Sequence, residues 1–208
     1  MRKLLRIDAD PQILTALVRD LADEYIDARK EAYPDIEVAD RDLALEPVGH
    51  LANDEDVDAL YAPPETHTVE MKQKAKYSDE LINEFTSADE IVIATPMYNL
   101  TVPSILKAYI DQVVRARKTF RFTADGPHGL VGNKKMVIIT VCGGIYSKGE
   151  NKKLDFLHPY LKAIFQFVGI KDITFVRAEG LAIDPETREK AINQARKILL
   201  KLAKSSNF

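Results

Sequence analysis

The sequence is short of the residues from which several kinds of site are built. It contains one cysteine, Cys142, which excludes an internal disulfide and a cysteine-rich metal site. Four histidines are scattered without the spacing of metal ligands: His50, His67, His128 and His158. We therefore expect no metal centre.

Long apolar runs and a large excess of one charge are also missing. No apolar run approaches the roughly 20 residues of a membrane span, and the first strand-like stretch is too short and too charged for a signal peptide. The formal net charge of -3 gives no broad attraction for nucleic acid or for an anionic membrane. We expect a cytoplasmic protein whose partners are small molecules or proteins, with no nucleic acid and no membrane.

The 208 residues do contain a regular alternation of strand-like and helix-like runs. Such alternation is typical of an α/β domain with a parallel sheet covered by helices on both faces, and we expect one domain over residues 1–208. The expected strands are 3–7, 36–41, 90–95, 135–141 and 173–177, and the expected helices are 12–30, 69–85, one from 103, 154–168 and one from 185. The runs "EIVIAT" and "MVIITV" are nearly continuous and predict central strands.

Two connections between these elements are long. Residues 46–67 are polar and interrupted by glycine and prolines, so we interpret them as an excursion without an element of its own. Residues 119–135 carry aromatic, basic and Gly/Pro residues and are a candidate functional loop.

The loop after the third expected strand, "TPMYNLTVPS", is the most informative one. In an open parallel sheet, ligands bind beyond the carboxyl ends of the strands. A proline stiffens each end of this loop, and between them stand Met97, Tyr98, Asn99 and Leu100. These residues could hold a flat heteroaromatic ring, or they could form a turn that covers the core.

The loop after the fourth expected strand, "VCGGIYSKG", offers a close approach of backbone to a ligand. Gly143 and Gly144 allow that approach, although a Gly-Gly pair is also common in plain turns. Cys142 stands where a nucleophile could sit, but no histidine partner is present in the local motif. A buried structural thiol is the preferred interpretation of Cys142.

The loop after the first expected strand carries two carboxylates, Asp8 and Asp10, before Pro11. Asp10 followed by Pro11 predicts an N-cap and a first-turn residue, with Asp8 exposed to solvent. An acidic pair here also holds Mg²⁺ in phospho-acceptor receiver domains, but those need an acceptor Asp after the third strand and a Lys after the fifth. Neither residue stands at those strand ends in this sequence.

A short basic run follows the third long helix, made of Arg115, Arg117, Lys118 and Arg121. We interpret it as a solvated helix end, with contact to an anionic ligand as the alternative. His128 in "DGPHG" is interpreted as a surface residue, with a place in the pocket as the alternative.

The stretch from Ile91 to Ser147, which contains both loops, strongly resembles the FMN-dependent NADH azoreductase and quinone reductase family. The resemblance continues through "HPYLKAIFQFVGI" and "FVRAEGLA" and covers most of the chain. It implies a flavodoxin-like three-layer sandwich with strand order 2-1-3-4-5, and a homodimer with FMN at the subunit interface. It also implies ping-pong, two-electron hydride transfer from NADH or NADPH to quinones and azo compounds.

Carried over by motif, the resemblance implies a site for each part of the flavin. Met97, Tyr98, Asn99 and Leu100 would contact the isoalloxazine ring, Gly143 and Gly144 its pyrimidine edge, with Val141 and Cys142 beside them. Phe120 and Phe122 would line the substrate pocket over the flavin. No catalytic side chain is implied, because the flavin carries the redox chemistry.

The sequence departs from the family where the phosphate would bind. Family members usually have serines at the start of the first helix, whereas this chain has Asp8 and Asp10 and no serine before Thr15. A carboxylate that caps this helix would occupy the anion site and repel a phosphate. Two hypotheses therefore remain: a flavin oxidoreductase, or a family member with weakened or lost FMN binding that serves as a dimeric binding or structural protein.

Overall fold

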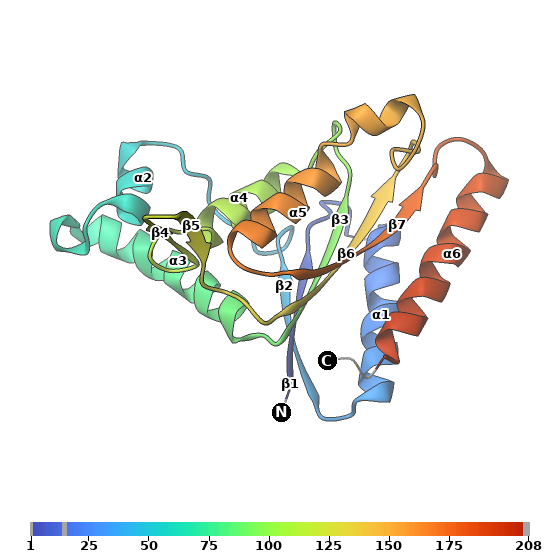
Figure 1. Cartoon of the computed structure of the whole chain (residues 1–208), viewed down its shortest axis with the longest axis horizontal. Helices are drawn as coiled ribbons and strands as arrows, with labels where there is room; N and C mark the ends of the chain where they lie inside the picture. The colour runs from blue at the N-terminus through green and yellow to red at the C-terminus, as the bar shows by residue number, and fades with distance from the viewer. Residues whose placement is uncertain (1, 14–15, 206–208) are drawn as a thin grey trace.

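A computed structural model describes residues 2–13 and 16–205. Its main sheet has five parallel strands in the order β2-β1-β3-β6-β7, which confirms the predicted flavodoxin-like order (Figure 1). The strands are β1 (Arg2–Asp8), β2 (Ile36–Asp42), β3 (Glu90–Pro96), β6 (Lys135–Cys142) and β7 (Asp172–Glu179).

Helices cover both faces of this sheet (Figure 1). One face is covered by α1 (Leu17–Ala32) and α6 (Pro185–Ala203), and the other by α3 (Val69–Ser87), α4 (Ser104–Val113) and α5 (Leu157–Phe167). Short 3-10 turns are η1 (Pro64–Thr66) and η2 (Glu150–Leu154). No helix in the described part of the chain is long and apolar enough to cross a membrane.

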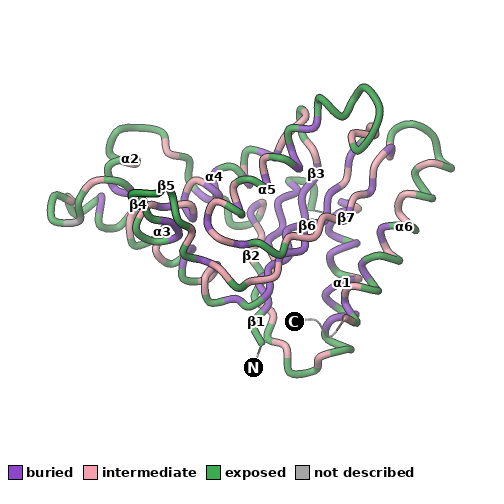
Figure 2. Tube along the Cα trace, in the orientation of Figure 1, coloured by how far each residue is buried: buried purple, intermediate pink, exposed green. Residues whose placement is uncertain are grey.

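The central strands are buried on both faces, as their apolar runs predicted. Every residue of β3 is buried (Figure 2). Its side chains alternate between two cores. Ile91 and Ile93 face α3, α4 and α5, while Val92 and Ala94 face α1 and α6. This double burial fixes the register of β3, since a slip of one residue would exchange the two faces.

The sequence predicted no helix or strand in residues 46–67, and this prediction was wrong. They include α2 (Asp54–Tyr61), which buries Ala59 and Leu60. Asn53 caps this helix, because its side-chain oxygen accepts a hydrogen bond from the Asp56 amide at 3.0 Å. The acidic run that looked like a loop is the first turn of a capped helix.

The expected functional loop at 119–135 contains a small hairpin, β4 (Phe120–Thr123) paired with β5 (Gly126–Gly129). The last helix begins where it was predicted, with Asp184 accepting the Thr187 amide at 2.8 Å and Pro185 in the first turn.

The first helix does not begin where it was predicted. It starts at Leu17 rather than Gln12, and Ala16 is its N-cap residue. Asp10 instead closes a local turn, with its Oδ1 accepting the Gln12 amide at 2.9 Å. The prediction that Asp10 and Pro11 cap and open α1 was therefore wrong.

Candidate functional site

The candidate site lies where the strand order reverses, at the carboxyl ends of β1 and β3. Flavodoxin-like sheets bind their ligand at this switch point. The loops after these two strands lie close together, because Asp10 in the first loop acts on the hydroxyl of Tyr98 in the second. Burial raises the pKa of Tyr98, and the charge of Asp10 raises it further.

The loop after β3 forms a tight turn with an unusual backbone. Tyr98 and Thr101 exchange two backbone hydrogen bonds of 3.0 Å, and between them Asn99 and Leu100 have φ of 47° and 73°. Two successive left-handed residues that are not glycine carry backbone strain, which tends to persist where function requires it. The turn leaves the Asn99 amide exposed, and the Phe156 amide holds the Leu100 carbonyl at 3.1 Å.

The loop after β6 lies beside this turn. The Met97 amide donates to the Val141 carbonyl at 3.0 Å, which ties the two strand ends together. A Cβ at Gly144 would lie 3.2 Å from the ring of Tyr146, so that ring would have to shift by a few tenths of an ångström to admit a side chain. The structure thus brings together the two loops in which the sequence analysis placed Met97 to Leu100 and Val141 to Gly144.

Cys142 is enclosed in the core at the end of β6. Its side chain is buried, and burial raises the pKa of the thiol to about 12, with Glu179 and Asp155 adding to the shift. A thiol at neutral pH is not a nucleophile, so the structural interpretation holds.

We expect Cys142 in the folded protein to resist a disulfide exchange reagent at pH 8. The reagent needs the thiolate, whose fraction is small far below a pKa of about 12 and rises only as the pH approaches it. Labelling should become complete once the protein is unfolded in denaturant. Rapid labelling of the folded protein would contradict this burial.

At the end of β1, Asp8 is buried rather than exposed, which corrects the sequence analysis. Arg6 Nε lies 2.8 Å from its Oδ2 and Arg19 Nη1 lies 3.7 Å from the same atom. Burial raises the pKa of the Asp8 carboxyl, an effect that the two arginines oppose. Asp8 is therefore part of an internal ion cluster and does not project toward a ligand.

Among the described residues, neither Asp10 nor the N-cap residue Ala16 caps the start of α1 through a side chain. Arg19 in this turn binds the Asp10 carbonyl at 2.7 Å and Asp42 at 3.0 Å. Because Asp10 is not the cap, its carboxylate does not occupy the anion site that this helix end offers.

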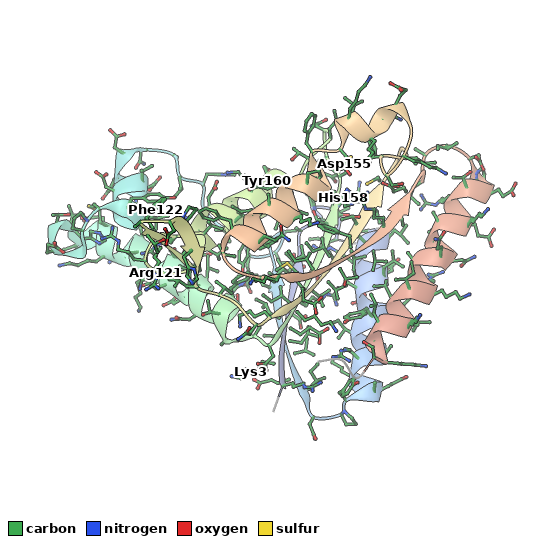
Figure 3. The ribbon with its side chains drawn as sticks, viewed as in Figure 1. Lys3, Arg121, Phe122, Asp155, His158 and Tyr160 are labelled. Atoms are coloured by element: carbon green, nitrogen blue, oxygen red, sulfur yellow. The ribbon has the colours of Figure 1, made fainter. Side chains whose placement is uncertain are left out.

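The sequence analysis missed a buried polar cluster under the end of β6. His158, which it treated only as one of four scattered histidines, is 3% exposed. Its Nδ1 lies 2.9 Å from both oxygens of Asp155, and its Nε2 lies 3.0 Å from Thr140 Oγ1 (Figure 3). Burial lowers the pKa of His158, although Asp155 opposes this. The spacing of Asp155 and His158 in "DFLHP" was the available signal.

The aromatic hairpin lies away from these loops within one chain (Figure 3). Phe120 is buried against Phe167, with ring centroids 4.5 Å apart, at the far end of α5 from His158. Nine residues of helix separate those positions, which is about 14 Å at 1.5 Å per residue. Phe122 is 73% exposed. One chain alone does not bring Phe120 and Phe122 to the candidate flavin loops.

The basic run is only partly a solvated helix end. Arg115 is buried and binds Asp79 at 2.8 Å, and Lys118 binds the same carboxylate at 3.1 Å. Arg121 is exposed on the hairpin, and His128 is exposed as expected.

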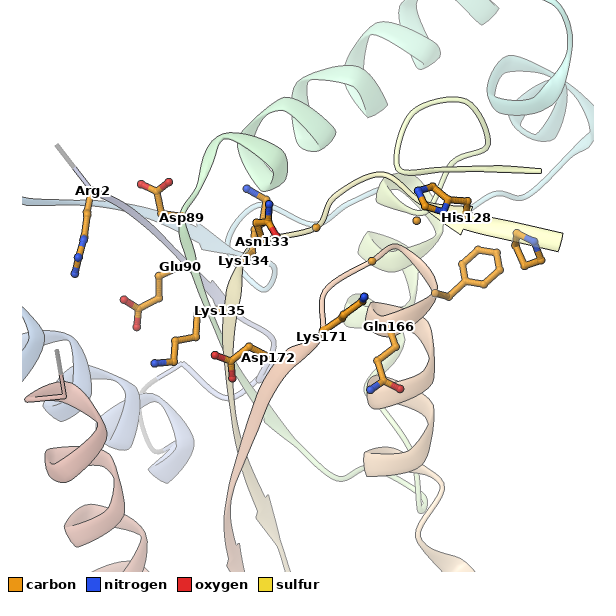
Figure 4. A pocket seen from close by; sticks show the side chains of 15 residues that line it. Arg2, Asp89, Glu90, His128, Asn133, Lys134, Lys135, Gln166, Lys171 and Asp172 are labelled. Atoms are coloured by element: carbon orange, nitrogen blue, oxygen red, sulfur yellow. The ribbon is translucent and has the colours of Figure 1, made fainter. Parts of the chain in front are cut away.

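A cavity of about 980 Å³ lies at the opposite end of the sheet, among the amino ends of the strands (Figure 4). Lys134, one of the lysines that line it, donates from Nζ to the carbonyls of Thr86 and Ala88 at the end of α3. Two hollows of about 500 and 550 Å³ flank the candidate site instead, one at Tyr98 and Asn99 and one at Gly144. These two hollows lie at the carboxyl ends of the strands, where open parallel sheets bind their ligands.

The sheet order and the paired loops at its switch point define a flavodoxin-like α/β protein. A family model described as a flavodoxin-like fold matches residues 2–203. An FMN-dependent NADH:quinone oxidoreductase from Nostoc sp. is 43% identical over 94% of this chain and 95% of its own length. One from Chromobacterium violaceum is 36% identical over 97% and 99%.

Solved structures support the same family assignment. The azoreductase from Bacillus anthracis str. Sterne superposes with a TM-score of 0.91 at 29% identity, covering 98% of this chain and 99% of that one. An FMN-dependent NADH-azoreductase from Bacillus anthracis str. Ames Ancestor, in complex with FMN, gives 0.87 at 29% identity, covering 98% and 100%. The chain belongs to the family of FMN-dependent NADH:quinone oxidoreductases and azoreductases.

Proposed function

We propose that this protein is an FMN-dependent NADH:quinone oxidoreductase that also reduces azo compounds. The observation that carries the proposal is the left-handed turn at Asn99 and Leu100, which the Met97 amide ties to Val141 at the end of β6, just before the two glycines. The names of the relatives at 36% to 43% identity support the cofactor, the donor and the acceptor class.

The residues at the switch point offer the hydrogen-bonding groups that FMN needs, namely backbone amides and carbonyls and the Asn99 side chain. Met97, Tyr98, Asn99 and Leu100 would hold the isoalloxazine ring, largely through backbone groups and the Asn99 amide. The loop of Val141, Cys142, Gly143 and Gly144 would meet its pyrimidine edge, where the glycines permit close approach. The first-turn amides of α1 would receive the phosphate.

Bound FMN would supply the redox chemistry, taking a hydride from NADH or NADPH and passing two electrons to the acceptor. The task of this chain is then to bind, to orient and to keep water from the ring. No acid or base is assigned, since the nearby Cys142 thiol and His158 ring are buried and engaged inside the protein.

We further propose a homodimer in which Phe122 of the partner subunit lies over the flavin. Phe122 is the most exposed of the large apolar side chains that are described, yet it lies away from the loops of its own chain. A second copy would bury this ring and close the substrate pocket. A cytoplasmic location agrees with a chain that carries a single cysteine.

Steady-state kinetics tests the proposed activity. With FMN present, the rate is measured with NADH varied at several fixed concentrations of a benzoquinone. The double-reciprocal plots should be parallel lines, as expected for a ping-pong reaction. Absence of quinone-dependent NADH oxidation would favour the alternative, a family member that serves as a dimeric binding or structural protein.

Replacing Asn99 with alanine should weaken flavin binding about tenfold, because one hydrogen bond is worth about 1.4 kcal/mol at this site. Alanine also strains the left-handed backbone, whereas glycine at the same position does not. Asn99→Gly is therefore the matched variant and should weaken binding similarly in a fluorescence titration. Wild-type affinity in Asn99→Gly would show that the amide does not contact the ring.

A further inference from the structure

We propose that Glu179, at the carboxyl end of β7, is a positioning residue that holds the loop of residues 143–147 in the shape that receives the flavin ring. We name residues 143–147 the glycine loop. The inference rests on the proposed function, since that is what assigns the ring to this loop. Glu179 touches neither substrate nor cofactor in this account and acts through the backbone.

The Glu179 carboxylate binds two successive amides of the glycine loop. Its Oε1 accepts the Tyr146 amide and its Oε2 accepts the Ser147 amide, each at 3.3 Å. The side chain is only 10% exposed, so water competes weakly for these bonds. Hydrogen bonds to an ionised acceptor are stronger than neutral ones, and two together fix the orientation of both peptide groups.

The backbone after Glu179 holds the other end of the same loop. The Gly180 amide donates to the Gly144 carbonyl at 2.9 Å, and the Ala182 amide donates to the Gly143 carbonyl at 3.0 Å. Gly180 has φ of 80°, and a Cβ there would lie 2.9 Å from Thr187 Cγ2. The left-handed backbone and this close approach both favour glycine at 180, where the chain turns beside the loop.

Glu179 is itself next to a row of polar side chains, in which Asp155 and His158 are buried and Arg177 is 30% exposed. Arg177 Nη1 lies 3.8 Å from Glu179 Oε1 and 3.5 Å from Asp155 Oδ2. Asp155 is in turn fixed by His158, which also binds Thr140. The polar cluster under β6 (Figure 3) thus ends on the carboxylate that anchors the glycine loop.

This anchoring matters for binding because two adjacent glycines make the loop costly to order. Gly loses more conformational freedom on ordering than any other residue. A ligand that meets a loop already held in place avoids that cost and binds more tightly. Loss of the anchor should therefore weaken every ligand that uses the ring end of the site, whether or not it carries a phosphate.

The test compares Glu179→Ala and Glu179→Gln with Glu150→Ala as the control. Glu150→Ala removes an equal charge from a nearby position. The Glu150 side chain is 94% exposed and pairs with Lys153. Each protein is titrated with FMN and with riboflavin, which has no phosphate. Glu179→Ala should raise both dissociation constants about tenfold, Glu179→Gln about threefold, and Glu150→Ala should change neither.

Amide hydrogen exchange of the flavin-free proteins separates this inference from the proposed function. The peptide that contains residues 143–147 should exchange faster in Glu179→Ala, while the peptide of β3 should not change. Unaltered exchange, or unaltered affinity for both flavins in a folded variant, would overturn the inference. If Glu179→Ala does not fold, hydrogen exchange and flavin affinity are measured on Glu179→Gln instead.

Failure of the wild-type protein to bind either flavin would overturn the proposed function. Hydrogen exchange would still decide whether Glu179 anchors the glycine loop.

Discussion

Replacing Glu90 with alanine should lower the free energy of unfolding by about 3 to 5 kcal/mol, the cost of removing one partner of a buried ion pair. Glu90 is 3% exposed, and its Oε2 receives both Nε and Nη2 of Arg29 at 3.1 and 3.0 Å. Arg29 is fully buried, so alanine would leave its charge poorly compensated in the core. Tyr25 would also lose its acceptor on Glu90. Urea unfolding monitored by circular dichroism measures the change.

Glu24→Ala is the matched control for this prediction. Glu24 pairs with Arg196 at 2.8 Å, but the two side chains are 35% and 43% exposed. Such a surface pair contributes less than about 1 kcal/mol. Equal losses in the two variants would contradict the role assigned to the Arg29 and Glu90 pair, which joins α1 to the start of β3 and so fixes the elements that carry the flavin loops.

Replacing Asp10 with asparagine should tighten FMN binding by about 10- to 100-fold and leave riboflavin binding unchanged. Asp10 lies near the first turn of α1, where Arg19 binds its carbonyl, and its charge raises the pKa of Tyr98. A charge about 5 Å from a phosphate costs on the order of 3 kcal/mol at an effective dielectric near 20, and about 1.4 kcal/mol corresponds to a factor of ten. Asparagine keeps an oxygen for the Gln12 amide and so preserves the local turn.

Asp35→Asn supplies the control for net charge, because Asp35 is exposed just before β2 at the other edge of the sheet. Asp35→Asn should change neither the affinity for FMN nor the affinity for riboflavin. If Asp10→Asn changes FMN and riboflavin binding by the same factor, the carboxylate does not face the phosphate. Asp8 is a poor choice for this test, since its removal would disturb the cluster with Arg6 and Arg19.

The sheet could be predicted from the sequence because its signals are local. The nearly continuous apolar runs of β3 and β6 can only be accommodated by burial on both faces, and that is where the structure places them. The same assignment located the two loops, because each one begins where its strand ends. Strand order and family came from the resemblance and were confirmed by the matched relatives.

The start of α1 could not be predicted because distant contacts decide it. Asp10 and Pro11 make a good local signal for a helix start. The structure instead begins the helix at Leu17, where Arg19 reaches the Asp10 carbonyl and Asp42 on β2. The burial of Asp8 has the same origin, since Arg6 and Arg19 balance its charge.

Two parts of the site depend on contacts between segments far apart in the chain. Glu179 meets the amides of Tyr146 and Ser147 across 33 and 32 positions, respectively, and no short motif encodes that contact. The place of Phe122 over the flavin stays a prediction, because it requires a second copy of the chain.

The central claim is that this protein binds FMN at the switch point, and a titration of the purified, flavin-free protein with FMN tests it most directly. Flavin fluorescence and the absorption band near 450 nm should both change with a single saturable curve. The account predicts saturation in the micromolar range or below, weakened in Asn99→Gly and strengthened in Asp10→Asn. No saturable change at high micromolar FMN would contradict it.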